Sequence, residues 1–213
     1  VVLAIGTELA ETDYDVTFAG GFKIPGALLR IDIDADQTVR NYPPQVALVA
    51  DAQIAAEALL QALNSQPLPP RDANWGAQRS AQLWAELAPT WDAATRAQTL
   101  FLNIVLQELP TAVIVGDSTQ PVYSANLTLN LDHPRRWFNS STGYGTLGYA
   151  LPAAIGAWLG RGDGQPVVCL IGDGGLQFTL PELASAVEAR TPVIVLLWNN
   201  QGYEEIKKYM VNR

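Results

Sequence analysis

The most constraining feature of the sequence is a pair of apolar runs, residues 167–171 (VVCLI) and 193–198 (VIVLLW). Neither run has the polar alternation of a strand with one solvated face, which indicates strands covered on both faces of a parallel sheet. Between the runs, Thr179 and Glu182 have the spacing of a capping box, and Pro181 fits a first helical turn, so we expect a helix to begin there. The stretch predicts a right-handed βαβ unit in an α/β fold.

Both predicted strands end in glycine and polar residues, namely 172–175 (GDGG) and 199–202 (NNQG). A right-handed crossover brings the two strand ends to one edge of the sheet, where α/β proteins bind ligands. The Asp173 carboxylate and the Asn200 amide oxygen suit Mg²⁺, which also accepts phosphate oxygens and water. The two glycines after Asp173 would let the backbone approach a phosphate closely.

The GDG motif and the NN pair, in this strand–helix–strand context, resemble the diphosphate and metal motif of enzymes that depend on thiamine diphosphate (ThDP). The resemblance implies Mg²⁺ ligands from Asp173, the Asn200 side chain and the Gly202 carbonyl. Two Gly-rich turns in an ordinary α/β domain are the alternative. The cofactor-binding set implied by the resemblance is Asp117, Ser118, Thr119, Gly145, Leu147, Gly172, Asp173, Gly174, Gly175, Asn200, Gly202 and Tyr203.

An earlier strand is predicted at residues 112–115, and it ends at Asp117, Ser118 and Thr119. Short hydroxyl side chains beside a strand end suit phosphate, although they equally suit the N-cap of a helix. The resemblance places this first loop near the diphosphate and the thiazolium ring. Tyr203 could likewise reach the diphosphate or be a core aromatic residue.

A glycine-rich segment, residues 143–148, precedes a predicted helix at 149–159 that is rich in small residues. The resemblance implies that the Gly145 carbonyl accepts a hydrogen bond from the ThDP aminopyrimidine. It also places Leu147 under the bend of the cofactor, which would press the aminopyrimidine nitrogen against thiazolium C2–H and give that proton transfer a high effective molarity. An ordinary core leucine is the alternative reading of Leu147.

We expect three parts in the chain, with parallel, three-layer α/β architecture in the two folded ones. Residues 1–64 resemble the C-terminal part of a Rossmann-like middle domain, residues 65–95 have the proline-rich composition of a linker, and residues 96–213 resemble the ThDP diphosphate domain without its C-terminal end. Because the glutamate that activates ThDP is expected in an N-terminal domain, we expect a piece of a longer polypeptide that is inactive alone.

Finer expectations follow for the elements. Strands are predicted at 1–5, 28–33 and 46–49, followed by a helix from Asp51 with Ile54, Ala58 and Leu59 or Leu60 on its buried face. A short helix is predicted at 80–87 within the linker. The next helix opens near Arg96 with residues 100, 101, 104, 105 and 109 on its apolar face, and residues 121–138, including His133, are expected to form a loop.

Composition excludes several classes of function. The net charge of −8 argues against nucleic-acid binding, and no apolar run is long enough to span a membrane. The lone Cys169 lies in an apolar strand, so no disulfide within the chain is possible and a reducing, cytoplasmic compartment is expected.

The resemblance is to the acetolactate synthase and 2-keto acid decarboxylase branch of the family. It implies non-oxidative decarboxylation of a 2-keto acid, with conversion of 5-guanidino-2-oxopentanoate to 4-guanidinobutanal as the candidate reaction. Asp117, Glu204 or Glu205 could then pair with the guanidinium group.

Two alternatives stay open at this point. One is acetolactate synthase-type carboligation, and the other is a non-catalytic module that keeps ThDP and Mg²⁺ for structure or assembly. FAD binds to some members of the branch and is absent from others, so the resemblance leaves FAD open. The resemblance also implies a homodimer or homotetramer.

Overall fold

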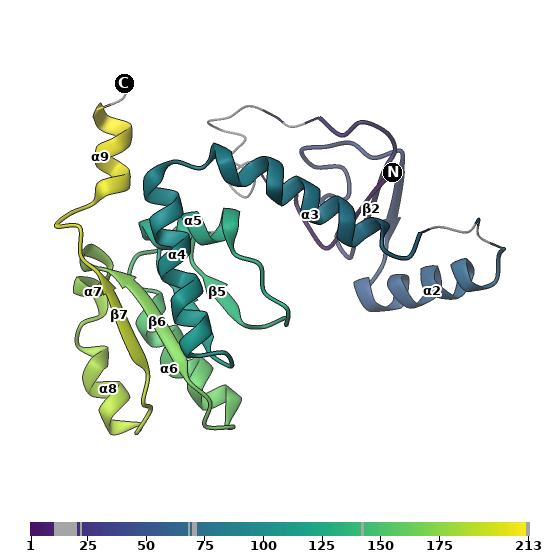
Figure 1. The fold of residues 1–213 in the computed structure, drawn as a ribbon. Coiled ribbons are helices and arrows are strands. Elements are labelled where there is room, and N and C mark those ends of the chain that lie inside the picture. Colours follow the sequence, from purple (N-terminus) through teal and green to yellow (C-terminus); the bar gives the residue numbers. More distant parts are fainter. Residues whose placement is uncertain (11–20, 22, 68, 70–71, 142, 212–213) are drawn as a thin grey trace. The chain divides into compact units, whose positions relative to one another are not determined.

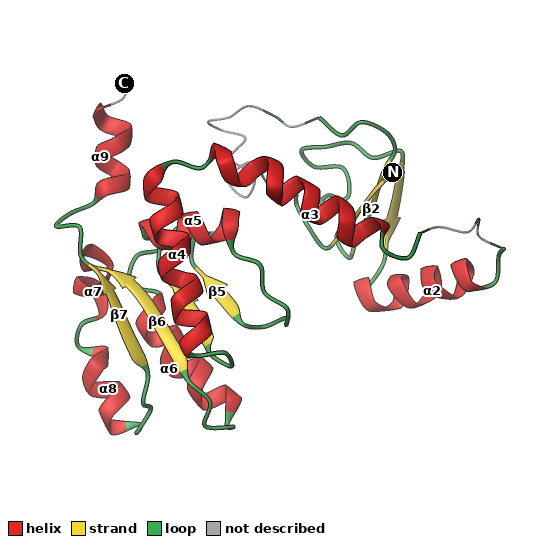
Figure 2. Ribbon diagram, in the orientation of Figure 1, coloured by secondary structure: helices red, strands yellow, loops and turns green. Residues whose placement is uncertain are grey.

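The computed structural model describes residues 1–10, 21, 23–67, 69, 72–141 and 143–211. It divides into two compact units, Val1–Gln82 and Leu83–Arg213. Each unit contains one fully parallel sheet, which confirms the predicted α/β class (Figures 1 and 2). The finer division at residues 64 and 96 stays a prediction, and positions 68, 70 and 71 of the expected linker lie outside the described residues.

The first unit contains a three-stranded sheet in the order β1-β2-β3. Its strands lie close to the predicted positions, and the helix that follows is capped by Asp51, whose carboxylate accepts hydrogen bonds from the Gln53 and Ile54 backbone N–H groups. The elements are β1 (Val2–Ile5), β2 (Leu28–Asp32), β3 (Val46–Val49) and α2 (Ala52–Asn64).

The predicted buried face of α2 is wrong. Ala55 is the buried residue of this helix, whereas Ile54 and Leu60 are 67% and 60% exposed. The helix carries apolar residues around much of its circumference, so its sequence alone does not identify the side that contacts β2. Helix α3 (Trp75–Leu87) also begins five residues earlier than expected and is followed by the 3₁₀ helix η1 (Ala88–Thr90).

The second unit contains a four-stranded sheet in the order β5-β4-β6-β7. It supplies the edge on which the candidate site is built. Its elements are α4 (Ala93–Glu108), β4 (Val113–Gly116), α5 (Gln120–Thr128), β5 (Trp137–Asn139), α6 (Ala150–Arg161), β6 (Val167–Gly172), α7 (Asp173–Thr179), α8 (Glu182–Glu188), β7 (Ile194–Trp198) and α9 (Glu204–Val211).

Both faces of the central strand β6 are covered, as its unbroken apolar sequence predicts. Val167, Cys169 and Ile171 pack in one cluster with residues of α6 and α8. Val168 and Leu170 pack on the opposite face in a cluster with residues of α4 and α5. The period-2 alternation of a strand therefore sends successive apolar side chains into two separate cores, one on each face.

Three local predictions in this unit differ from the structure, two of them entirely and one in part. Residues 121–138 contain helix α5 and strand β5 rather than a loop. On α4, Phe101, Val105 and Leu109 of the predicted face pack against the core around Leu102, whereas Leu100 and Ile104 are exposed. The face of α4 that is buried depends on how the helix meets the neighbouring layer.

The predicted capping box at Thr179 is the third error. Helix α7 already begins at Asp173, so Thr179 is its last residue, and α8 has no side-chain N-cap. The Thr179 hydroxyl is buried without a hydrogen-bond partner among the described residues. Asp173, Gly174 and Gly175 form the first turn of α7, because β6 leads directly into this helix.

Candidate cofactor site

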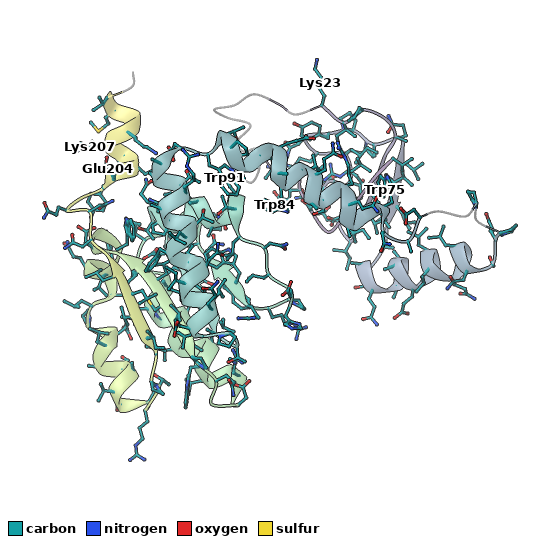
Figure 3. The ribbon with its side chains drawn as sticks, in the orientation of Figure 1. Lys23, Trp75, Trp84, Trp91, Glu204 and Lys207 are labelled. Atoms are coloured by element: carbon teal, nitrogen blue, oxygen red, sulfur yellow. The ribbon has the colours of Figure 1, made fainter. Side chains whose placement is uncertain are left out.

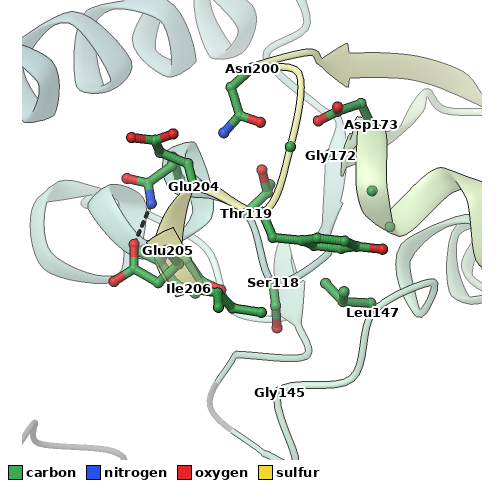
Figure 4. A pocket seen from close by; sticks show the side chains of 16 residues that line it. Ser118, Thr119, Gly145, Leu147, Gly172, Asp173, Asn200, Glu204, Glu205 and Ile206 are labelled. Atoms are coloured by element: carbon green, nitrogen blue, oxygen red, sulfur yellow. Dashed lines mark hydrogen bonds between the residues drawn. The ribbon is translucent and has the colours of Figure 1, made fainter. Parts of the chain in front are cut away.

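A cavity of about 240 Å³ lies at the carboxyl ends of β4, β6 and β7 (Figure 4). The loop after β4, the glycine-rich segment before α6, the start of α7 and the segment after β7 all contribute to its lining. All of the predicted cofactor-binding residues except Asp117 line this cavity. Segments far apart in the sequence therefore meet where parallel strands end, as expected for α/β proteins.

The three predicted metal ligands lie together in this cavity. One terminal atom of the Asn200 amide is 3.1 Å from Asp173 Oδ1 and 2.7 Å from the Gly202 carbonyl oxygen. With the amide oxygen in that position three oxygens converge, and with the amide rotated its NH₂ group donates to both partners. Octahedral Mg²⁺ with bonds of 2.0–2.1 Å holds adjacent oxygens about 2.9 Å apart, so the donor set fits Mg²⁺.

Local turn geometry brings Asn200 and Gly202 to this position. The Asn199 side chain accepts a hydrogen bond from Gln201 N at 3.0 Å, which closes a turn directly after β7. Gln201 has a left-handed backbone conformation with φ of 62°. No group of three or more His, Cys, Asp or Glu side chains forms a metal site among the described residues, so a metal here depends on neutral oxygens beside one carboxylate.

Two glycines at the start of α7 are required by close packing. A Cβ atom on Gly174 would lie 2.6 Å from Tyr203 Cε1, so the Tyr203 ring lies against this backbone. A Cβ atom on Gly175 would collide with the Asp117 carboxylate. The N-cap, Gly172, has no side chain to satisfy the first N–H groups of α7, and such N–H groups suit an anionic phosphate.

Asp117 lies beneath the cavity rather than in its lining, and it is 0% exposed. Its carboxylate accepts hydrogen bonds from Gly148 N at 2.8 Å and Ser118 N at 2.9 Å, and the Ser140 hydroxyl lies 3.4 Å from Oδ1. Burial raises the pKa of this carboxyl, and these hydrogen bonds oppose the shift. Asp117 therefore joins the first loop to the glycine-rich segment that presents Gly145 and Leu147.

The glycine-rich segment has backbone conformations that favour glycine. Gly145 has φ of 66° and Gly148 has φ of 84°. A Cβ atom on Gly148 would lie 2.9 Å from Phe178 Cβ, so this segment also packs tightly on α7. Gly145 N donates to the Ser140 carbonyl at 3.0 Å, and the Ser140 hydroxyl lies 3.0 Å from the Ser118 hydroxyl, which links the segment to the first loop.

The cavity lining also contains three residues that were not predicted from the sequence, namely Gln120, Tyr123 and Ile206. Gln120 and Tyr123 belong to α5, the helix that was missed at the sequence level. Pro121 beside the Thr119 N-cap is a helix-start signal that could have identified it. Gln120 also donates a short hydrogen bond to Glu205, which is another residue of the cavity lining.

A family comparison identifies this half of the chain. Residues 104–212, about half of the chain, match the family described as "Thiamine pyrophosphate enzyme, C-terminal TPP binding domain". Thiamine pyrophosphate is another name for ThDP. The match covers β4 to α9 and includes every residue that lines the cavity.

Similar proteins extend the comparison to the rest of the chain. The chain is 40% identical, over 99% of its length, to the "Probable 2-ketoarginine decarboxylase AruI" of Pseudomonas aeruginosa, and spans 37% of that protein. It is 31% identical, over 85% of its length, to 32% of the acetolactate synthase isozyme 3 large subunit of Escherichia coli.

A solved structure has the same fold. It is the ThDP-dependent 4-hydroxybenzoylformate decarboxylase of Rhodococcus jostii RHA1, which aligns with a TM-score of 0.63 at 22% identity over 99% of this chain and 38% of its own. The chain thus spans about a third of the length of these proteins, between 32% and 38%. Because the family match covers half of the chain and contains the whole cavity lining, the chain belongs to the thiamine pyrophosphate enzymes.

Proposed function

We propose that the protein containing this chain catalyses the ThDP- and Mg²⁺-dependent, non-oxidative decarboxylation of a 2-keto acid. The observation that carries this proposal is the convergence of Asp173, Asn200 and Gly202 oxygens in a cavity formed by the family's cofactor domain. The substrate we favour is 5-guanidino-2-oxopentanoate, because this compound is 2-ketoarginine and a relative 40% identical is described as acting on it.

Residues of this chain would hold the cofactor at both ends. We assign Mg²⁺ binding to Asp173, Asn200 and the Gly202 carbonyl, and diphosphate contacts to Ser118, Thr119 and the start of α7. When bound, ThDP supplies a carbon nucleophile at thiazolium C2 and an electron sink for the electrons released with CO₂.

The remaining roles concern orientation. The Gly145 carbonyl would accept from the aminopyrimidine amine and Leu147 would support the bend of the cofactor, since both residues line the cavity. Tyr203 would cover one side of the diphosphate from its position against Gly174. Asp117 would act beneath the cavity by holding the backbone that presents Gly145 and Leu147.

Assembly and compartment belong to the same proposal. We expect a homodimer or homotetramer, as the family resemblance implies, and light scattering of the full-length protein would test this. None of the helices in the described parts of the chain is long and apolar enough to cross a membrane. A cytoplasmic location suits the lone, buried Cys169.

The test uses the full-length protein with ThDP and Mg²⁺, offered 5-guanidino-2-oxopentanoate and pyruvate in separate reactions. We expect CO₂ and 4-guanidinobutanal from the first substrate and little reaction of the second. Acetolactate from pyruvate would instead assign the protein to carboligation, the function of its 31% identical relative, and FAD content would be measured next. Absence of reaction with any 2-keto acid would favour a non-catalytic module.

A variant tests the metal assignment independently of turnover. Asp173→Asn removes the one carboxylate of the donor set. We therefore expect ThDP binding, measured by calorimetry, to need an Mg²⁺ concentration at least tenfold higher than in the wild type. Asp132→Asn changes an exposed carboxylate outside the cavity and is the matched control. Equal Mg²⁺ dependence in the two variants would contradict the assignment.

A further inference from the structure

The charged side chains of the cavity lining are all acidic. Asp173, Glu204 and Glu205 line it, and the described lining contains no lysine, arginine or histidine. Mg²⁺ bound at Asp173 would compensate the first carboxylate. The other two would repel the carboxylate of a simple 2-keto acid, which makes them costly unless the substrate carries a positive charge elsewhere.

The two glutamates have different surroundings. Glu204 lies 3.6 Å from the Lys207 ammonium group one turn along α9, and both side chains extend from that helix in Figure 3. Glu205 has no lysine, arginine or histidine within ion-pair distance among the described residues. Glu205 is therefore the carboxylate whose charge is left without a cation.

Glu205 is also held in place. Gln120 Nε2 donates a short hydrogen bond to its Oε2 atom, and Oε1 accepts no hydrogen bond from the residues that the structure describes. An amide donor orients a carboxylate without neutralising it, so the negative charge stays available to a ligand. This contact joins α9 to α5, two helices that are far apart in the sequence.

The position of Glu205 suits the far end of an extended substrate. Figure 4 shows Glu204, Glu205 and Ile206 along one side of the cavity, with Asp173 and Leu147 along the other. Apolar surface from Ile206, next to Glu205, can contact an alkyl chain while the charged groups stay at the ends. Asp117 is unavailable for this role because it is fully buried and its oxygens accept backbone hydrogen bonds.

We propose that Glu205, oriented by Gln120, binds the guanidinium group of the substrate and selects for a cationic 2-keto acid. A guanidinium group presents paired N–H donors that match a carboxylate and stays charged at all physiological pH values. This inference rests on the proposed decarboxylase function, and it makes Glu205 a specificity-determining residue with no part in the chemical step.

The test compares two keto acids of nearly equal shape with the full-length holoenzyme. 5-Guanidino-2-oxopentanoate carries the cation, and 5-ureido-2-oxopentanoate is its neutral counterpart. A hydrogen bond to a charged group contributes about 1.5–3 kcal/mol, so we expect Glu205→Gln to lower kcat/KM for the guanidino substrate roughly 10- to 100-fold. The loss should lie mainly in KM, and kcat/KM for the ureido substrate should change less than about threefold by the same reasoning.

Two controls accompany this variant. Glutamine keeps an oxygen that can accept from Gln120, so ThDP affinity and the circular dichroism spectrum should match the wild type. Glu188→Gln removes an exposed carboxylate on α8, outside the cavity, and should leave the ratio of the two substrates unchanged. A variant that fails to fold is thereby distinguished from one that has lost substrate selection.

The possible outcomes separate the two proposals. An equal fall of kcat for both substrates would overturn the binding role of Glu205 and leave the decarboxylase intact. A wild type that consumes both substrates equally would do the same. If neither keto acid is consumed, the proposed function fails, and calorimetry with unreactive 5-guanidinopentanoate decides about Glu205: tenfold weaker binding to the Gln variant would support it, and equal binding would overturn it.

Discussion

Among the residues that the structure describes, each unit buries one charged side chain beside its parallel sheet, and the two charges are opposite. In the first unit, Arg30 of β2 is 2% exposed. Its guanidinium group donates to the Thr7 carbonyl at 2.7 Å, the Tyr42 carbonyl at 3.2 Å and the Arg40 carbonyl. In the second, Asp117 follows β4, is 0% exposed and accepts from backbone N–H groups. Backbone dipoles thus replace a counter-ion in both places.

The difference lies in what the bonded segments do. The partners of Arg30 are loop carbonyls of the first unit, which hold that unit together. The partner Gly148 of Asp117 follows Leu147, which lines the cavity. We therefore expect the buried cation to determine stability alone, and the buried carboxylate to determine stability and cofactor affinity together.

The largest effect is expected from Arg30→Met in the full-length protein. Three carbonyls would lose their donors in a buried place, and removing a partner from such a group costs about 1–3 kcal/mol. We expect unfolding by urea at a correspondingly lower concentration, with ThDP affinity unchanged. Arg40→Met, whose side chain is 60% exposed, is the control. A matching loss of ThDP affinity would break the distinction between the units.

Gly174→Ala tests how tightly the cavity side is packed. The new methyl group would lie 2.6 Å from the Tyr203 ring and must displace it, and overpacking of this kind costs typically about 1–3 kcal/mol. We expect a lower melting temperature and weaker ThDP binding. Gly160→Ala adds the same methyl group on α6 where nothing lies within 4 Å, so it should be neutral or slightly stabilising. Unchanged ThDP binding in the first variant would show that Tyr203 does not contribute to the site.

Asp117→Asn should separate cofactor affinity from chemistry. The amide keeps the size of the carboxyl but presents one NH₂ group to backbone donors, which displaces Gly148. The loss of one charge-assisted hydrogen bond, about 1.5 kcal/mol, corresponds to roughly tenfold weaker ThDP binding. Titration of ThDP by calorimetry measures this. ThDP affinity equal to that of the wild type would mean that Asp117, like Arg30, contributes to stability alone.

The same residue should give a pH dependence of defined sign. Because burial raises the pKa of the Asp117 carboxyl, the native state binds its proton more tightly than the unfolded state. Its contribution to stability is therefore greatest below the unfolded-state pKa and decreases as the pH rises through the native pKa. Melting temperatures of the wild type should fall relative to Asp117→Asn over that range, and a difference that is constant with pH would contradict the shift.

The smallest effect is expected at Cys169, in the core beneath the cavity. Burial raises the pKa of this thiol to about 12, with a further contribution from the negative charge of Asp117. Only the thiolate reacts readily, so iodoacetamide at pH 8 should leave Cys169 unmodified in the native protein and alkylate it after unfolding. Peptide mass spectrometry measures the two fractions. Rapid native alkylation would mean that this core opens.

The local sequence pattern was sufficient to predict the structure where that pattern lay within a strand. The apolar runs, the right-handed crossover and the polar residues at strand ends together predicted the β6–β7 edge and the meeting of Asp173 with Asn200. The local sequence pattern was insufficient to predict which face of a helix is buried and where a helix begins. Thr179 has the local pattern of an N-cap, but β6 continues directly into α7, and the buried face of α4 depends on how that helix meets the sheet.

The sequence by itself therefore determined the α/β class and the strands other than β5, because these depend on short-range periodicity and on chirality, and its resemblance to ThDP enzymes supplied most of the cavity lining. Only the tertiary structure decided the roles that depend on partners distant in sequence. It buried Asp117 under Gly148 and Gly175, and it brought Gln120 of α5 to Glu205 of α9. Adjacent glutamates look alike in a sequence, and their difference comes from neighbours that packing brings to them.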